Sequence, residues 1–367
     1  MNRRHFIKQV SLLAANTALV NLPQNLIAAP AVHIKKTFRV GIFAPSHCSA
    51  PLVYASMNNL FKKQGLQVEL INYPVMAKLA KDLLSNVIDL GQIPTPLVFA
   101  IYHNTTPFPS GVPLVIPMIL GVHGSNLMVR NGAGISRPAD FKNKTIATNS
   151  KFSIHYLLTK LFLSQYGIDT EKEVRSVNLE LKDLATAMKN GTVDACMMPE
   201  PMNAIIEDSH MASTFLQNKF LWRYHPCCGL TMKKDRFAKH RQQIKDLVTT
   251  VTQASLFINK ERNRETLVSM LQKTPYGYAD IPEHVLKLAF MYERSAYYPF
   301  PYKSTAQVIL KMMRNLNLLP DISIPEVAHE VFLSDFMREC LAAIDVKAPR
   351  KNSRPEYVLG KIYELDS

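Results

Sequence analysis

The feature that most constrains the fold is a regular alternation of strand-like and helix-like segments from residue 37 onward. Runs of β-branched and aromatic residues predict the strands. The first helix ends with a basic turn and then Gly65, a common way for a helix to stop. Strands that alternate with helices predict a parallel sheet with right-handed crossovers. The predicted segments are strands over 37–44, 67–72 and 87–91 and helices over 50–64, 76–85 and 94–102.

A second run of the same kind starts at Ser125, after an apolar stretch over 112–122 that predicts a buried strand. It comprises strands over 126–130, 144–148 and 193–197 and helices over 136–141, 154–166 and 183–189, with Ser153 as the N-cap of the longest helix. After a strand over 229–232 the chain is mainly helical. Those last helices are predicted over 242–259, 264–272, 282–290, 305–315 and 327–342.

These two runs predict an α/β protein of two lobes, each a mostly parallel sheet flanked by helices, with a ligand cleft between the lobes. The second lobe is inserted into the first. We expect the first lobe over 36–124, the second over 125–224, a mostly helical return to the first lobe over 225–346, and a loose basic tail over 347–367.

The first 31 residues read as an export signal rather than as part of a lobe. Arg3, Arg4 and Lys8 precede a short apolar run, and Ala29-Pro30-Ala31 fits a small-residue cleavage site. The paired arginines followed by an aromatic residue and a lysine resemble a twin-arginine signal. The sequence therefore predicts a periplasmic protein whose signal peptide is removed.

Charge and cysteine content narrow the function classes. The formal net charge is +14, of which three charges lie in the signal, so 14 − 3 = +11 belongs to the rest. Such an excess favours an anionic partner. The basic stretch over 233–241 falls on a predicted turn and helix start, so we read it as a solvated face and expect no nucleic acid. The cysteines match no zinc spacing and are interpreted as small buried residues, with a redox role for Cys227-Cys228 as the alternative.

Three phrases carry a family resemblance: ISRPADFKNKTIA over 135–147, DLATAMKNGTVDACMMPEPMN over 183–203, and YPFPYKST over 298–305. Together they resemble the solute-binding proteins of ABC importers in the nitrate/sulfonate/bicarbonate group, most of all the nitrate- and bicarbonate-binding branch. The resemblance spans about residues 37 to 320. It implies a type II periplasmic binding protein fold.

The resemblance also implies ligand-binding residues. Lys303, in Pro301-Tyr302-Lys303-Ser304, matches the segment whose lysine meets the oxyanion, and His225 matches the segment that supplies a histidine. His155 stands where the family usually has Gln. Gln92 stands where the branch shows Gln-Trp, but Ile93 lacks the indole N–H. Glu200 belongs to the family's Glu-Pro turn.

Two further candidates come from the chemistry of the residues. Ser153 opens a helix, and a helix N-terminus offers free N–H groups to an anion. His47 follows the first strand, at an edge where ligands bind in α/β folds. Glu200 could instead touch a cation or an amine, and it is the acidic candidate if a bicarbonate ligand requires a metal.

The sequence thus predicts the periplasmic substrate-binding component of an ABC importer, which binds a small oxyanion such as nitrate or bicarbonate. Its partners would be the ligand and the membrane subunits of a permease, and we expect a monomer without a cofactor. No GxSxG, P-loop, GxGxxG or HExxH motif is present, so we expect no enzyme. The alternatives are a ligand sensor of the same fold that acts through a protein partner, a binder of sulfonate or thiamine-pyrimidine solutes, and an exported enzyme.

Overall fold

The structure, a computed structural model, describes residues 36–105 and 111–365. The predicted export signal over 1–31 lies outside the described residues. Within those ranges, no helix is both long enough and apolar enough to cross a membrane.

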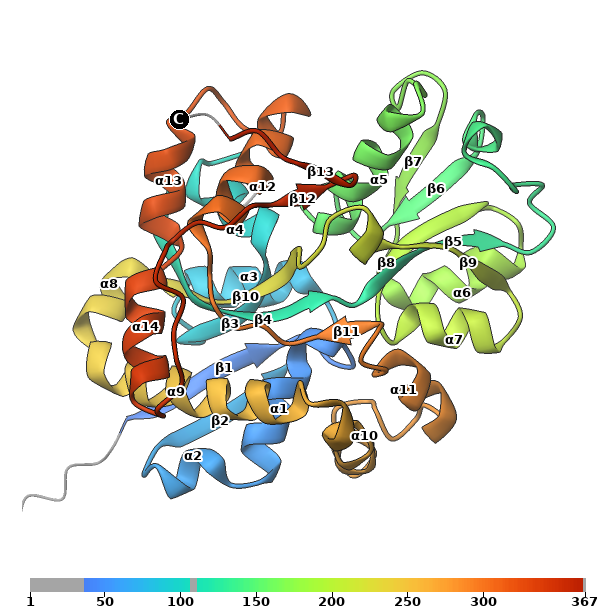
Figure 1. The fold of residues 1–367 in the computed structure, drawn as a ribbon. Coiled ribbons are helices and arrows are strands. Elements are labelled where there is room, and N and C mark those ends of the chain that lie inside the picture. The colour runs from blue at the N-terminus through green and yellow to red at the C-terminus, as the bar shows by residue number, and fades with distance from the viewer. Residues whose placement is uncertain (1–35, 106–110, 366–367) are drawn as a thin grey trace, which may run out of the picture. The chain divides into compact units, whose positions relative to one another are not determined.

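The first sheet joins strands from both ends of the described chain (Figure 1). Its order is β11-β4-β10-β3-β1-β2. β1 pairs in parallel with β2 and β3, whereas β10 runs antiparallel to β3 and β4. The strands are β1 (Thr37–Ile42), β2 (Gln67–Asn72), β3 (Leu90–Pro94), β4 (Leu114–His123), β10 (Pro226–Lys233) and β11 (Ser295–Ala296).

The second sheet is built only from strands between Ser125 and Gln217, in the order β7-β6-β8-β5-β9. β6 pairs in parallel with β7 and β8, and β5 runs antiparallel to β8 and β9. The elements are β5 (Ser125–Arg130), η2 (Pro138–Phe141), β6 (Thr145–Thr148), α5 (Ile154–Gln165), β7 (Arg175–Asn178), α6 (Leu181–Lys189), β8 (Ala195–Pro199), α7 (Met202–Asp208) and β9 (Ala212–Gln217).

Both sheets are therefore mixed, which corrects the prediction of mostly parallel sheets. The cause lies where the chain passes between them. β4 leads directly into β5 through Gly124, and β9 leads into β10 through residues 218–225, which include η3 (Asn218–Phe220). β5, which carries the chain into the second sheet, and β10, which brings it back to the first, each run antiparallel to both of their neighbours.

The remaining helices pack mainly around the first sheet, which together with them forms the first lobe. α3 and α4 contact β3 and β10, and α1 packs against α9. The elements are η1 (His47–Ser49), α1 (Ala50–Met57), α2 (Leu60–Lys63), α3 (Met76–Leu84), α4 (Thr95–Tyr102), α8 (Lys234–Lys239), α9 (Arg241–Ile258), η4 (Glu261–Asn263), α10 (Arg264–Leu271), α11 (Glu283–Ala289), α12 (Lys303–Asn315), α13 (Ile324–Val331) and α14 (Ser334–Ala342).

Two predicted helices are each divided in the structure. The helix over 50–64 breaks at Asn59, whose φ of 55° is left-handed. The helix over 327–342 breaks between α13 and α14, because the Leu333 N–H leaves the helical pattern and donates to the Ile116 carbonyl at 3.1 Å. Packing against β4 thus overrides a continuous helical pattern.

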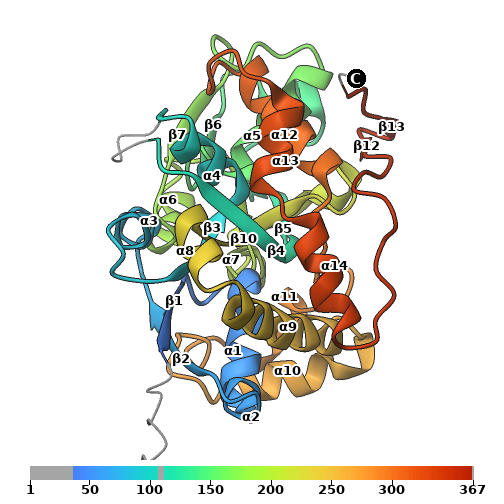
Figure 2. The ribbon, with the colours of Figure 1, turned by 90° about the vertical axis from the view of Figure 1, so that its left-hand side faces the viewer.

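The C-terminal tail is docked, which shows that the prediction of a loose tail was wrong for residues 347–365. Figures 1 and 2 show the chain running back from α14 to a short hairpin of β12 (Tyr357–Val358) and β13 (Lys361–Ile362). The Glu356 side chain, only 2% exposed, accepts hydrogen bonds from Trp222 Nε1 at 3.0 Å, Ser304 Oγ at 2.9 Å and Thr305 Oγ1 at 2.6 Å. One carboxylate therefore ties the tail to the segment before β10 and to α12.

Replacing Glu356 by Ala should lower the free energy of unfolding by about 3 kcal/mol, because three buried donors lose a charged acceptor. Urea unfolding followed by circular dichroism measures this. Glu364→Ala, at an exposed position of the same tail, is the matched control and should leave stability within about 0.5 kcal/mol. Equal stability of the two variants would contradict the anchoring role of Glu356.

Candidate functional site

A chamber of about 330 Å³ opens between the two lobes. One wall comes from the first lobe and the other from the loop before α5 and the end of β7, so the structure confirms the predicted cleft. Most of the lining is apolar or amide, and Lys151 and Glu180 are its charged residues. The lining comprises Phe43, Met76, Ala77, Pro94, Leu97, Asn149, Ser150, Lys151, Phe152, Asn178, Leu179, Glu180 and Leu181.

A smaller inner cavity of about 20 Å³ adjoins the chamber and shares Phe43, Met76, Pro94 and Asn149 with it. Its volume suits a single water-sized group. Among the described residues, no Lys, Arg, Asp or Glu lines it. Four predicted site residues meet here: His47, Gln92, Ser153 and His155. The rest of the lining is Phe43, Ser46, Cys48, Met76, Pro94, Asn149, Ile154, Pro199, Cys227 and Cys228.

Gln92 lies on β3 and its amide is already bonded at both ends. Its Oε1 accepts from the Phe43 N–H at 3.2 Å, and its Nε2 donates to Ser46 Oγ at 3.0 Å. Gln92 therefore fixes the loop after β1, which carries His47, and has little capacity left for a ligand.

Ser153 is the N-cap of α5, as predicted. Its Oγ accepts from the Tyr156 N–H at 3.2 Å and donates to the Ser150 carbonyl at 2.6 Å. The hydroxyl is thus occupied by the turn that it stabilises. What the helix start presents to the cavity is the next polar side chain, His155.

His155 and His47 each have one buried ring nitrogen with no hydrogen-bond partner among the described residues. His155 Nδ1 lies 3.1 Å from Asn149 Oδ1, which leaves Nε2 unpaired. In His47 the unpaired atom is Nδ1. An unpaired buried polar atom costs about 1–3 kcal/mol. Both histidines line the inner cavity, one from each lobe, so a ligand that bonds both would recover this cost.

Burial keeps these imidazoles neutral at neutral pH. Loss of hydration lowers the pKa of His47 and of His155 to about 3, and nearby histidines add to the effect for both. Burial likewise lowers the pKa of His225 to about 4. The inner cavity therefore offers N–H donors and nitrogen acceptors but no positive charge.

His225 is buried and does not belong to the lining of the inner cavity. Its Nδ1 lies 2.7 Å from the Trp222 carbonyl, and its ring packs edge-on against His123 with centroids 5.4 Å apart. His225 Nε2 is buried and unpaired in the described part of the chain.

Glu200 is buried away from both cavities. Its Oε1 lies 2.7 Å from Arg294 Nη2, and its Oε2 accepts from the Ala204 N–H at 3.1 Å. Burial raises the pKa of Glu200, and the Arg294 charge opposes that shift. The Glu200 side chain of the Glu-Pro turn thus forms an ion pair with Arg294 of the first lobe.

Lys303 begins α12 and lines neither cavity. Its Nζ lies 2.6 Å from His329 Nδ1, and burial lowers the pKa of Lys303. The lysine on the cleft is Lys151, whose Nζ sits 5.0 Å from the centre of the Phe152 ring.

Sequence reasoning missed several lining residues, including Phe43, Asn178 and Cys48. It singled out the Cys227-Cys228 pair, but as small buried residues or a redox pair and not as part of the cavity lining. Phe43 directly follows the parallel strand β1, and Asn178 is the last residue of the parallel strand β7. Both lie at the edge of a sheet where α/β folds bind ligands. That rule could have found Phe43. It could not have found Asn178, because β7 was not predicted.

The sequence profile of the NMT1-like family matches residues 33–272. This chain belongs to the NMT1-like family. It is 23% identical over 373 residues to the nitrate/nitrite binding protein NrtA of Nostoc sp., a match that covers 90% of this chain and 83% of that protein. It is also 23% identical over 249 residues to the bicarbonate transport ATP-binding protein CmpC of Synechococcus elongatus, which covers 64% of this chain and 37% of that protein. The chain therefore spans little more than a third of this longer relative.

Among solved structures, the periplasmic nitrate-binding protein NrtA from Synechocystis PCC 6803 superposes with a TM-score of 0.80 at 20% identity. The match covers 89% of this chain and 94% of that one. It confirms the predicted periplasmic binding protein fold.

The buried histidines should make stability fall on acidification. The folded pKa of His155 is about 3, against 6.5 for an unperturbed side chain, so between these values only the unfolded chain takes up the proton. His155 therefore costs about 1.4 kcal/mol of stability for each pH unit lost in that window. His155→Gln should remove this part of the slope in urea unfolding at about pH 5 and about pH 7.

His210→Asn is the control, because His210 is exposed and its left-handed φ of 55° suits Asn. An unchanged slope in His155→Gln would show that His155 is protonated in the folded protein at pH 5.

Proposed function

We propose that this protein is the solute-binding component of an ABC importer and holds a small solute between its two lobes. One observation carries the proposal: His47 and His155, from different lobes, line one inner cavity, and each has a buried ring nitrogen without a partner among the described residues. A ligand that bonds both would favour the closed arrangement of the lobes. The similarity to proteins named for nitrate and bicarbonate supports the same reading.

For the ligand we propose a small oxyanion, nitrate or bicarbonate among the candidates. The N-terminus of α5 carries the positive end of a helix dipole, and Lys151 adds a charge at the chamber wall. The neutral His155 would donate a hydrogen bond from the same helix start. An anion at the start of α5 would pair with the charge of Lys151 in the chamber and would accept N–H hydrogen bonds at the inner cavity.

A second candidate is a solute with an anionic group and an apolar body, such as a sulfonate. The observation that favours it is the chamber itself, whose 330 Å³ exceeds what a four-atom ion fills and whose walls include Phe43, Leu97 and Phe152. The polar group would then lie against Lys151 and the body against these side chains.

In either case the proposed role is binding without turnover. The protein would act in the periplasm as a monomer that delivers its solute to the membrane subunits of a permease. A sensor of the same fold would bind the same solute but remain in the cytosol with its N-terminus uncleaved.

Solute binding should raise the melting temperature, because ligand binds the folded state alone. A screen of nitrate, nitrite, bicarbonate, sulfonates and pyrimidine amines by thermal shift should find at least one such solute. For that solute, His155→Ala should raise the dissociation constant more than tenfold in calorimetry, since a bond of about 1.4 kcal/mol is lost. His103→Ala is the matched control, because His103 also has an unpaired buried nitrogen but lines neither cavity. Equal effects of the two variants would contradict the site.

Two lysines can be compared directly as partners of an anionic solute. Lys151→Ala should weaken binding, and more so at low salt, because its charge lies at the chamber wall. Lys303→Ala should leave the dissociation constant within about twofold, since Lys303 contacts His329 instead. The reverse result would restore Lys303 as the lysine that meets the anion.

A further inference from the structure

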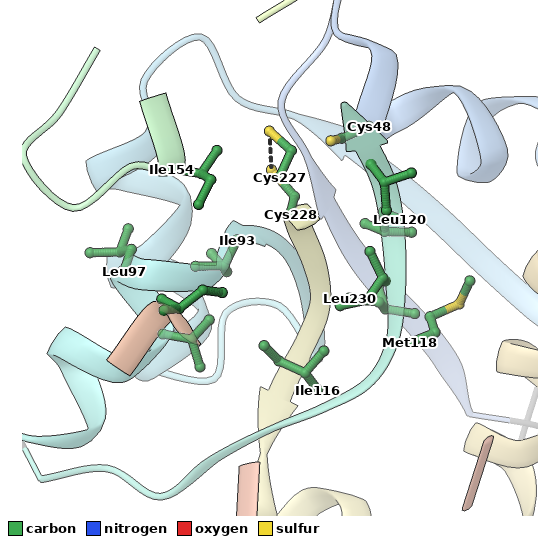
Figure 3. Packing of buried hydrophobic residues seen from close by; sticks show 14 of the residues in the cluster. Cys48, Ile93, Leu97, Ile116, Met118, Leu120, Ile154, Cys227, Cys228 and Leu230 are labelled. Carbon is green, nitrogen blue, oxygen red and sulfur yellow. Dashed lines mark hydrogen bonds between the residues drawn. The ribbon is translucent and has the colours of Figure 1, made fainter. Parts of the chain in front are cut away.

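Three buried side chains of the metal-binding types His and Cys converge at the inner cavity. His47 and Cys48 belong to η1, and Cys227 lies at the start of β10. One ligand atom from each lies within 4.8 Å of the other two. Figure 3 labels all three cysteines: Cys48, which belongs to η1, and Cys227 and Cys228, which belong to β10. None of the five cysteines, all in the described ranges, forms a disulfide.

The spacing is close to what one ion requires. Zinc bonds thiolate sulfur at about 2.3 Å and imidazole nitrogen at about 2.0 Å, so tetrahedral ligand atoms lie about 3.5 to 3.8 Å apart. His47 Nε2 lies 3.2 Å from Cys48 Sγ. The largest separation in the set is bounded by 4.8 Å, so small side-chain rotations would complete the geometry. Cys228 Sγ lies 3.9 Å from Cys227 Sγ but outside the set of three, so it would have to move further to act as a fourth donor.

The surrounding backbone leaves room for these side chains. A Cβ on Gly124 would lie 2.3 Å from His47 Nε2, and a Cβ on Gly121 would lie 2.9 Å from Cys48 Sγ. The backbone of His47 is also held, since its N–H donates to the Glu200 carbonyl at 3.0 Å and its carbonyl accepts from Tyr297 Oη at 3.2 Å. The imidazole and the thiol are thus packed against glycines on a fixed turn.

The plain alternative is that these cysteines only fill space, as buried cysteines often do. Cys196 and Cys340 fit that description, because each is buried without a second cysteine or histidine in a cluster of this kind. The cluster at the cavity differs, because it joins two segments far apart in sequence. It also contains His47, whose other ring nitrogen has no partner within the described chain.

We propose that His47, Cys48 and Cys227 bind one thiophilic metal ion, Zn²⁺ or Cu⁺. Two thiolates and one imidazole suit these ions. No carboxylate of the described residues lines the cavity, which disfavours Mg²⁺ and Ca²⁺. The fourth position would be taken by Cys228 or would face the cavity. The inference rests on the cluster alone and does not depend on the proposed transport function.

The test uses the purified full chain, kept reduced under inert gas and stripped of metal with a chelator. Co²⁺ serves as a spectroscopic substitute for Zn²⁺ and should give a sulfur-to-cobalt charge-transfer band that saturates at one ion per chain. Zn²⁺ and Cu⁺ are then titrated against chromogenic chelators, which tells the two ions apart. Cys48→Ser and Cys227→Ser should each weaken binding more than tenfold and reduce the band. Cys196→Ser and Cys340→Ser, which also remove a buried free thiol each, should leave both unchanged.

The proposal is overturned if the wild-type protein does not bind one metal ion per chain. It is also overturned if the two control variants weaken metal binding as much as Cys48→Ser and Cys227→Ser do. Should Cys48→Ser or Cys227→Ser fail to fold, X-ray absorption of the Zn²⁺-loaded wild-type protein decides instead. A shell with sulfur and nitrogen supports the site, and a shell of oxygen alone refutes it. Solute binding is measured separately on the stripped protein, so a failure of the metal site and a failure of the transport function give different results.

Discussion

The buried ion pair between Glu200 and Arg294 fixes the point where the two lobes meet. Arg294 precedes the edge strand of the first sheet, and Glu200 follows a central strand of the second. Backbone hydrogen bonds join the same two residues through Gly124. The Gly124 N–H donates to the Arg294 carbonyl, and the Gly124 carbonyl accepts from the Glu200 N–H, both at 2.8 Å. Arg294 Nη1 also bonds Glu207 at 2.7 Å. Removing one partner of such a buried pair typically costs about 3–5 kcal/mol, because the other charge is left without compensation.

The cavity depends on that junction. The Glu200 carbonyl holds the His47 N–H, and Gly124 leaves the space that the His47 ring occupies. His155 reaches the same cavity from the second lobe on the first turn of α5. The junction therefore holds the backbone of His47, although neither Glu200 nor Arg294 lines the cavity. The described lining of the inner cavity is an uncharged set that includes imidazoles, thiols, hydroxyls and two amides, and the charged residues Lys151 and Glu180 line the outer chamber.

Local signals were enough to predict much of this fold. The alternation of strands and helices gave two α/β units, and Ser153 was recognised as a cap because capping depends on residues three apart. Strand direction was not predictable in this way, since β10 is antiparallel only because the chain returns from the other lobe.

Glu200 and Lys303 show the same limit at the site. Each has the right chemistry for a ligand contact, but its partner, Arg294 or His329, is distant in sequence and becomes visible only in three dimensions. The meeting of Cys48 with Cys227 was not predicted for the same reason, because no short motif joins these two cysteines.

The docked tail has a consequence for motion between the lobes. Glu356 holds Trp222, which lies on one of the two segments that join the sheets, and also Ser304 and Thr305 on α12. That connection is therefore tethered to the first lobe, whereas the other consists of Gly124 alone between β4 and β5. The glycine is held as well, because its N–H and its carbonyl both bond to backbone at the lobe junction. A rotation of the second lobe would therefore have to break the backbone bonds of Gly124 or strain the segment that Glu356 anchors.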